Sequence, residues 1–319
     1  MAGLRNFGIT FILSLLLFGV GGYFLVGFAT SNMEDVFGAP VGLTDEYGNP
    51  APTEDLSAQE EEDDFVVPDG DTFTALILGF DRNEPDADKP PQIDMAMLIK
   101  VYKEKREVIY ISIPGTMRLF VDGNYLSLTD VFNIKGIGFL SSKITGVTGL
   151  PVNYYVTVGM DGMIRALNNL GTVSYNVPVD MVHNPNNTEQ PEFSIRAGKQ
   201  DLTAQGVLNV MRFKNYPATS AGETARMNTQ RNMIKEICNQ KLIEGSLTSA
   251  PETFKAIAAN MTTNFTFDDF VKNVDLIFAY SKLEIVDTGE YPTVEKVEDG
   301  AYFLIPSVDK AINRYIEYR

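Results

Sequence analysis

The chain has 319 residues and a formal net charge of −16, with 42 acidic and 26 basic residues. Its single cysteine excludes an intramolecular disulfide, and its single histidine excludes a multi-histidine metal site and argues against a Ser-His-Asp hydrolase. The acidic balance offers no basic surface to a nucleic acid.

Residues 7–29 form an uncharged, apolar run of 23 residues. As a helix at about 1.5 Å per residue, this run spans roughly 34 Å, enough to cross a bilayer core. A cleavable signal peptide is the alternative, but its apolar region is normally only about 7–15 residues long. Arg5 precedes the run and acidic residues follow it, so residues 1–6 are predicted to stay in the cytoplasm. The rest of the chain is then expected outside, anchored by this single helix.

Residues 30–71 are predicted to be an extended acidic linker. Between 31 and 71 there are 13 acidic residues and no Lys or Arg, with prolines scattered among them. Such a segment repels itself and has too little apolar surface to fold. The remaining residues, 72–319, carry 25 basic and 29 acidic residues, so most of the net charge belongs to the linker and not to a binding face.

Residues 72–319 alternate short β-rich runs with helical ones, which is typical of an α/β domain. Strands are predicted at 73–79, 96–102, 108–113, 154–158 and 173–177. Helices are predicted at 129–145, 161–170, 203–212, 223–243, 251–260 and 267–280. Several strands are apolar on both faces, so the expected fold is a three-layer α/β/α sandwich with a central mixed sheet. About 250 residues can form this as one domain.

Two isolated residue types are predicted to be structural. Cys238 lies in an apolar-periodic stretch and is expected to be a small buried hydrophobe and not a reactive thiol. His183 is followed by Asn184 and Pro185, which predict a turn with an exposed histidine.

Two aspartates lie at neighbouring strand ends. Asp81 follows the first predicted strand, and Asp94 precedes the second. In open α/β sheets ligands bind outside strand ends, and two carboxylates there can share a Mg²⁺ ion together with phosphate oxygens. The alternative is that both are ordinary turn or cap residues.

A second polar cluster begins where a predicted helix ends at Arg212 and Lys214. The next helix places Glu223, Arg226 and Gln230 on one face, because residues three and four apart are neighbours on a helix surface. A guanidinium, an amide and a carboxylate therefore converge. The alternative is a solvated face with an internal Glu–Arg pair.

These pieces resemble, in order and spacing, the LytR-CpsA-Psr family of cell-envelope phosphotransferases. The resemblance covers most of residues 72–245, and the C-terminal part continues it through Asn-Phe-Thr at 264–266 and Tyr-Phe-Leu-Ile-Pro at 302–306. The segments that carry it are Ala-Leu-Ile-Leu-Gly-Phe-Asp at 75–81, Ile-Asp-Met-Ala-Met-Leu at 93–98, Ser-Ile-Pro at 112–114, the run 150–162, the runs 170–173 and 177–178, Arg-Phe-Lys at 212–214, and Arg226 with Gln230.

The resemblance implies transfer of a glycopolymer phosphate, such as a teichoic acid, from a polyprenyl-pyrophosphate carrier to peptidoglycan. It assigns Mg²⁺ to Asp81 and Asp94, and pyrophosphate to Arg212, Lys214 and Arg226. Gln230 would orient phosphate oxygens, and Glu223 would hold Arg226 or act as the acid/base group. An apolar tunnel would hold the lipid. Phosphoryl transfer suits such a site because it needs positioning and charge neutralisation more than covalent help.

Several family cations are neutral residues here. The changed positions are Gln92, Gly115 with Thr116, the run 127–129, and Thr229. Each charged hydrogen bond to phosphate contributes about 1.5–3 kcal/mol, so pyrophosphate binding is expected to be weaker unless other cations substitute. The candidates are Arg82, Lys89, Arg118 and Arg231. The alternative function is a degenerate family member that binds polyprenyl-phosphate lipid, wall polymer or a partner enzyme without catalysis. A transcription regulator is not supported by a cytoplasmic segment of six residues.

Overall fold

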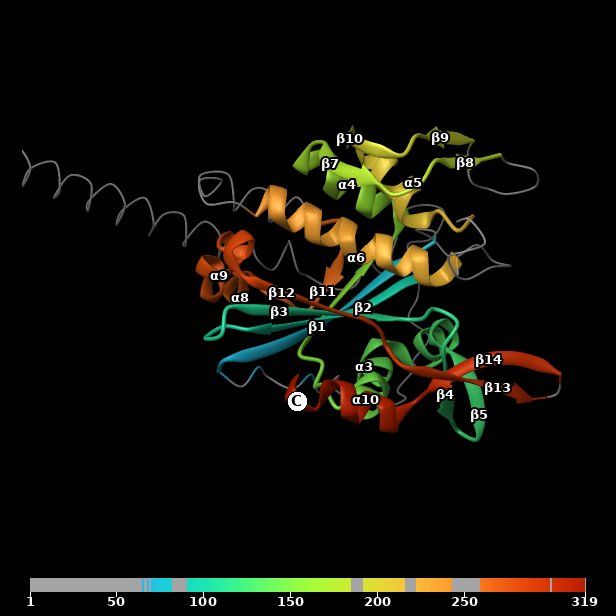
Figure 1. Ribbon diagram of the computed structural model, residues 1–319. Coiled ribbons are helices and arrows are strands. Elements are labelled where there is room, and N and C mark those ends of the chain that lie inside the picture. Colours follow the sequence, from blue (N-terminus) through green and yellow to red (C-terminus); the bar gives the residue numbers. More distant parts are fainter. Residues whose placement is uncertain are drawn as a thin grey trace, which may run out of the picture. The chain divides into compact units, whose positions relative to one another are not determined.

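The computed structural model describes residues 65, 68, 70–81, 91–184, 192–215, 222–242, 259–298 and 300–318 (Figure 1). The chain divides into two units, Met1–Glu60 and Glu61–Arg319, and every described residue belongs to the second. The predicted anchor at 7–29 and nearly all of the predicted linker lie outside the described residues. Within the described part, no helix has the length and apolar character needed to cross a bilayer.

A six-stranded mixed sheet forms the centre of the domain, in the order β11-β6-β1-β2-β3-β12. The central strand β2 is antiparallel to both β1 and β3, β6 is parallel to β1, β12 is parallel to β3, and β11 is antiparallel to β6. The strands are β1 Thr72–Phe80, β2 Ile93–Tyr102, β3 Glu107–Ile113, β6 Tyr154–Val158, β11 Thr262–Thr263 and β12 Glu284–Glu290. Four predicted strands are thus confirmed as the middle of the sheet.

The remaining strands form two-stranded ribbons outside this sheet. The fifth predicted strand is β7, which pairs with β10 and not with the central sheet. Asp122 and Gly123 both have positive φ in the β4–β5 turn, the geometry that two-residue hairpins favour. The ribbons are β7 Val173–Val177 with β10 Gly198–Leu202, β4 Arg118–Val121 with β5 Asn124–Ser127, β8 Met181–His183 with β9 Phe193–Ile195, and β13 Thr293–Glu298 with β14 Ala301–Pro306.

The helices agree with the predicted ones within a few residues, except near 251–280. The predicted helix 251–260 lies almost wholly outside the described residues, and the predicted helix 267–280 is divided at the buried residue Asn273. The helices are α3 Leu128–Thr148, α4 Met160–Leu170, α5 Ala204–Arg212, α6 Gly222–Lys241, α8 Phe267–Lys272, α9 Val274–Phe278 and α10 Val308–Tyr315, with short 3-10 turns η2 Tyr280–Lys282 and η3 Ile316–Tyr318.

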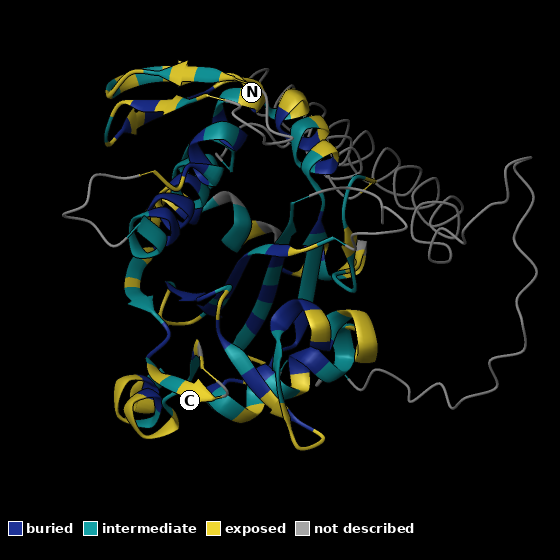
Figure 2. Cartoon of the chain, turned by 90° about the vertical axis from the view of Figure 1, so that its right-hand side faces the viewer, coloured by how far each residue is buried: buried dark blue, intermediate teal, exposed yellow. Residues whose placement is uncertain are grey.

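The two faces of the sheet carry separate hydrophobic cores, which gives three layers (Figures 1 and 2). Successive side chains of a strand point to opposite faces, so Leu98 packs in the core beneath α3 and α10, and Met97 in the core beneath α4, α5 and α6. Both side chains are almost fully buried. Burial on both faces explains the near-continuous apolar sequence of the middle strands. The mixed α/β fold with a central mixed sheet is therefore confirmed.

The structure agrees with the predicted structural role of Cys238 and contradicts the predicted exposed turn at His183. Cys238 lies on α6 beside Tyr110, and burial raises the pKa of its thiol to about 12, which keeps it protonated and agrees with a structural role. His183, in contrast, is not in an exposed turn. It ends β8, is half-buried, and stacks on Phe193 with ring centroids 5.5 Å apart. Because asparagines and a proline follow His183, the sequence pattern predicted a turn where a short strand ends.

Candidate active site

The candidate site lies where β1 ends and β2 begins, facing the loop after α5 and the first turns of α6. Phe80 and Ile93 are register partners, so the residues that follow them, Asp81 and Asp94, lie at the same end of the two central strands. Gly222 opens α6 so close to the Lys214 carbonyl that a Cβ there would lie 2.8 Å from this oxygen. The glycine therefore lets α6 begin directly against the Lys214 backbone.

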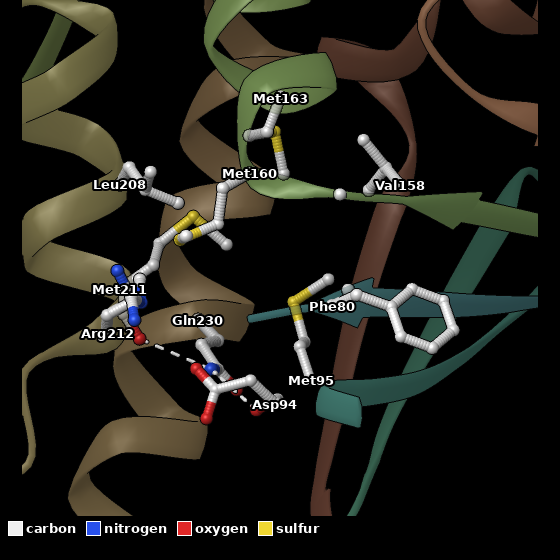
Figure 3. A pocket seen from close by; sticks show the side chains of 12 residues that line it. Phe80, Asp94, Met95, Val158, Met160, Met163, Leu208, Met211, Arg212 and Gln230 are labelled. Atoms are coloured by element: carbon white, nitrogen blue, oxygen red, sulfur yellow. Dashed lines mark hydrogen bonds between the residues drawn. The ribbon is translucent and has the colours of Figure 1, made fainter. Parts of the chain in front are cut away.

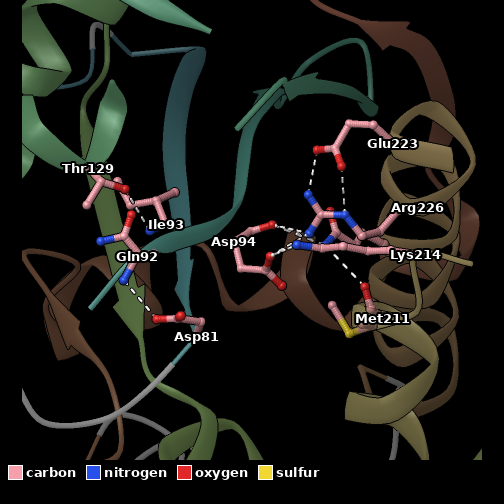
Figure 4. A network of polar contacts seen from close by, with 10 residues as sticks. Asp81, Gln92, Ile93, Asp94, Thr129, Met211, Lys214, Glu223 and Arg226 are labelled. Atoms are coloured by element: carbon pink, nitrogen blue, oxygen red, sulfur yellow. Dashed lines mark hydrogen bonds and ion pairs between the residues drawn. The ribbon is translucent and has the colours of Figure 1, made fainter. Parts of the chain in front are cut away.

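Asp94 is the residue on which the other elements converge (Figure 4). Its Oδ1 accepts a hydrogen bond from Arg226 Nη1 at 2.8 Å and lies 3.1 Å from Lys214 Nζ. Arg226 Nη1 also donates to the Asp94 backbone carbonyl at 2.6 Å. Asp94 is the second residue of β2 and does not precede this strand, so the rigid sheet holds its carboxylate. Two cations from different segments thus share one carboxylate oxygen.

Arg226 is held from its own helix as well. Nε and Nη2 donate to the two carboxylate oxygens of Glu223 at 3.1 and 2.5 Å, a bidentate pair between residues three apart. Only 4% of the Arg226 side chain is exposed, which rules out the solvated-face alternative. Burial alone would lower the pKa of Arg226, but Glu223 and Asp94 outweigh it and raise this pKa, so the guanidinium stays charged.

Gln230 connects three elements beneath this ion-pair cluster. Its Nε2 donates to the Met211 carbonyl at 3.2 Å and approaches the Asp94 carbonyl at 3.4 Å. These bonds join α6 to the last turn of α5 and to the start of β2. Gln230 is buried, so its amide fixes the framework around Asp94.

Asp81 points to a different partner. Its Oδ1 accepts from the Gln92 backbone N–H at 2.8 Å, and its own N–H donates to the Gln92 carbonyl at 3.0 Å. Figure 4 shows Asp81 turned toward Gln92 and Asp94 turned toward Arg226. The described residues contain no cluster of three or more His, Cys, Asp or Glu that could hold a metal by itself. A magnesium ion here would need phosphate oxygens to complete its ligands.

A methionine-rich recess opens beside Asp94 (Figure 3). Asp94, Arg212 and Gln230 line its polar end, and the apolar lining includes four methionines, Met95, Met160, Met163 and Met211. The recess encloses about 40 Å³, room for one or two water molecules and not for a polyprenyl tail in this arrangement. Methionine side chains rearrange readily, so this wall is adaptable.

The structure describes two of the four other predicted cations. Arg118 is on β4, 4.6 Å above the ring of Phe303, and Arg82 and Lys89 lie outside the described residues. Arg231 is buried and donates to Asp287 Oδ1 at 2.8 Å, to Ser112 Oγ at 2.7 Å and to Asn228. It therefore ties α6 to β3 and β12, and with only 3% of its side chain exposed it does not present its guanidinium to a phosphate in this arrangement.

The sequence interpretation missed two residues that shape this region. Asp287 on β12 pairs with both Arg231 and Lys235. The four-residue spacing of Arg231 and Lys235 on α6 was the available signal for an acidic partner. Thr129 accepts the Ile93 N–H at 2.9 Å, fixing the residue before Asp94. Nothing local in the sequence indicates that bond.

A model of the LytR_cpsA_psr family matches residues 44–315. The chain belongs to the LytR_cpsA_psr family. An uncharacterized protein of Staphylococcus aureus is 24% identical over 260 residues, covering 79% of this chain and 62% of that protein. The Bacillus subtilis protein named polyisoprenyl-teichoic acid–peptidoglycan teichoic acid transferase TagU is 23% identical over 263 residues, covering 81% of this chain and 77% of TagU.

Solved structures share the fold of this chain. Bacillus subtilis TagV has a TM-score of 0.63 at 14% identity, covering 79% of this chain and 98% of TagV. TagT bound to LI-WTA has a TM-score of 0.57 at 16% identity, covering 77% of this chain and 91% of TagT. At these identities the likeness establishes the fold, and the chemistry must be argued from this chain's own residues.

Proposed function

We propose that this protein transfers a glycopolymer phosphate from a polyprenyl-pyrophosphate carrier to peptidoglycan. The observation that carries the proposal is the Asp94 cluster, where Arg226 and Lys214 meet one carboxylate beside Arg212 and an adaptable apolar recess. Membership in the family and relatives named TagU support it. The experiment that tests it is transfer from a synthetic polyprenyl-pyrophosphate glycan to peptidoglycan by the purified full chain.

In the proposed reaction, an acceptor hydroxyl oxygen attacks the phosphorus on the glycopolymer side of the pyrophosphate. A new P–O bond forms to the acceptor, the P–O bond to the carrier phosphate breaks, and polyprenyl phosphate leaves. Arg226, Lys214 and Arg212 would neutralise the phosphate oxygens as charge shifts toward the leaving group. Glu223 uses both oxygens to hold Arg226, which favours a positioning role over an acid/base role. The hydroxyl proton would pass to solvent or to phosphate.

Asp81 and Asp94 would hold Mg²⁺ once pyrophosphate oxygens complete the site, and the ion would supply further charge neutralisation between the phosphates. Asp94 Oδ1 already serves two cations, so pyrophosphate would have to draw Lys214 and Arg226 toward itself for the carboxylate to accept a metal.

Magnesium should therefore raise the melting temperature of the protein only when a polyprenyl pyrophosphate is also present. Asp94→Asn and Asp81→Asn should each remove that increase, because neutral amides are weak magnesium ligands. Asp122→Asn, at a surface residue with a 72% exposed side chain, is the matched control and should keep it. An unchanged melting temperature of the wild type with both additions would contradict the metal assignment.

We further propose that the domain lies on the outer side of the membrane, anchored through residues 7–29. Length and charge asymmetry around that run support this placement. Protease added to intact protoplasts is expected to digest the domain, whereas a cytoplasmic control protein stays intact. A protected domain would reverse the assigned orientation.

A second candidate function is binding of the lipid carrier without catalysis. It is favoured by the positions where neutral residues replace the family's polar and cationic ones, because these residues have structural roles here. Ser127 caps α3 by accepting the Asp130 N–H, Thr129 accepts the Ile93 N–H, and Thr229 is buried. The transfer assay separates the two functions. A binding module would retain polyprenyl phosphate and transfer nothing.

A further inference from the structure

Two β-hairpins, β4–β5 and β13–β14, pack together at one end of the domain (Figure 1). Met117, just before β4, makes a bridge to Leu304 on β14. Three rings from the two hairpins form a row, with centroids 5.0 Å apart for Phe120 and Tyr125 and 5.4 Å apart for Tyr125 and Phe303. The aromatic row therefore joins the two hairpins, with Phe303 buried at one end and Phe120 exposed at the other.

A groove of about 400 Å³ lies along these hairpins, ten times the space of the recess beside Asp94. Its lining combines aromatic rings, hydroxyls and charges of both signs: Thr116, Arg118, Ser127, Glu295, Tyr302 and Phe303. Among the lining residues, Tyr302 is 77% exposed, although large aromatic side chains are usually buried.

The groove adjoins the candidate active site through the backbone. Gly115 precedes the groove residue Thr116, and a Cβ at Gly115 would lie 3.5 Å from the carbonyl oxygen of Ile93, the residue before Asp94. Ser127, the register partner of Arg118, caps the helix whose Thr129 hydroxyl accepts the Ile93 N–H. A ligand in the groove would thus end close to the Asp94 cluster.

The chemistry of the groove identifies its ligand. Aromatic faces pack against the apolar C–H faces of sugar rings, and hydroxyl, amide and mixed charged groups satisfy the polar edges of a sugar. A phosphate-rich polymer would favour uniform positive charge, whereas Arg118 and Glu295 give this lining charges of both signs. We propose that this groove binds the acceptor glycan strand of peptidoglycan. The inference rests on the proposed function, in which that strand is the acceptor.

The test is calorimetric titration of the full chain in detergent with soluble, uncross-linked peptidoglycan strands and no lipid carrier. Tyr302→Ala should weaken strand binding about tenfold or more, because it removes an exposed ring that lines the groove without opening the core. Tyr302→Phe keeps the ring and should change the affinity less than about threefold. Val182→Ala removes a similarly exposed apolar side chain on β8, at the opposite end of the domain in both views, and should have no effect.

Equal affinity of wild type and Tyr302→Ala would overturn the proposal, as would displacement of the strand by poly(glycerol phosphate), which would make the groove a polyanion site. A separate transfer assay distinguishes the two proposals. If the strand binds and Tyr302→Ala loses it, the groove stands even when no transfer is seen. If transfer occurs and Tyr302→Ala leaves the acceptor KM unchanged, the transferase stands and the groove does not.

Discussion

Arg226→Ala is expected to lower glycopolymer transfer by well over tenfold, at about 1.4 kcal/mol for each factor of ten. Arg226 supplies charge-assisted hydrogen bonds from a buried position. Lys214 cannot replace these bonds, because it is a flexible point charge with a 60% exposed side chain. The measurement is kcat/KM for transfer from a synthetic polyprenyl-pyrophosphate glycan.

Matched variants separate catalysis from folding. Arg226→Ala leaves Glu223 and Asp94 facing each other without their cation, so Arg226→Lys is the informative partner: it keeps the charge but loses the bidentate geometry. Lys214→Ala should cost less than either. Turnover of Arg226→Ala equal to that of the wild type, with a native circular dichroism spectrum, would remove Arg226 from the reaction.

Restoring family-like charge tests the alternative of a degenerate binder. Gly115 tolerates a side chain at its first atom, because a Cβ there would meet only the Ile93 carbonyl at an ordinary contact distance. Gln92 is exposed, and Gln92→Arg keeps the backbone N–H that Asp81 accepts. In a weak enzyme the double variant should raise kcat by neutralising transition-state charge. In a binder it should tighten lipid binding only.

The middle of the fold could be predicted from sequence because strands buried on both faces leave long apolar runs. β12 escaped prediction since Glu284–Glu290 contains Asp287, Thr288 and Gly289, and β11 since it has only two residues. The Asp-Gly sequence at 122–123 is typical of a hairpin turn and could have predicted the β4–β5 hairpin. Edge strands and ribbons depend on partners far away in the chain, so local pattern specifies them poorly.

The candidate site, like the fold, has one part that local sequence predicts and another part that it does not. The Glu223–Arg226 pair follows from helical spacing, which is a local property. The bond from Arg226 to Asp94 joins residues separated by 132 positions, a proximity that no local sequence pattern indicates. The resemblance placed both residues in one site, but only the structure shows that Asp94 already holds Arg226 and that Asp81 faces Gln92.

The largest stability effect is expected from Asp287→Asn. Arg231 has 3% of its side chain exposed, and Asp287 is its carboxylate partner, so the variant leaves a buried positive charge without compensation. Breaking such a pair typically costs about 3–5 kcal/mol. Denaturant unfolding followed by far-UV circular dichroism measures this loss, since the chain has no tryptophan. Asp122→Asn, which breaks an exposed pair with Lys135, should cost no more than about 1 kcal/mol.

The pH dependence of unfolding gives Asp287 a signature of its own. Burial alone would raise the pKa of Asp287, but Lys235 and Arg231 outweigh it and lower this pKa below its ordinary value. A carboxyl with a lowered folded-state pKa stabilises the fold above its ordinary pKa, about 3.9, and loses that contribution as pH falls through the folded value. Wild-type stability should therefore fall steeply below about pH 4, and Asp287→Asn should start lower and fall less steeply. Parallel acid profiles would show that Asp287 does not carry this charge. Arg231→Met in the same background should recover part of the loss, because it removes the uncompensated guanidinium itself.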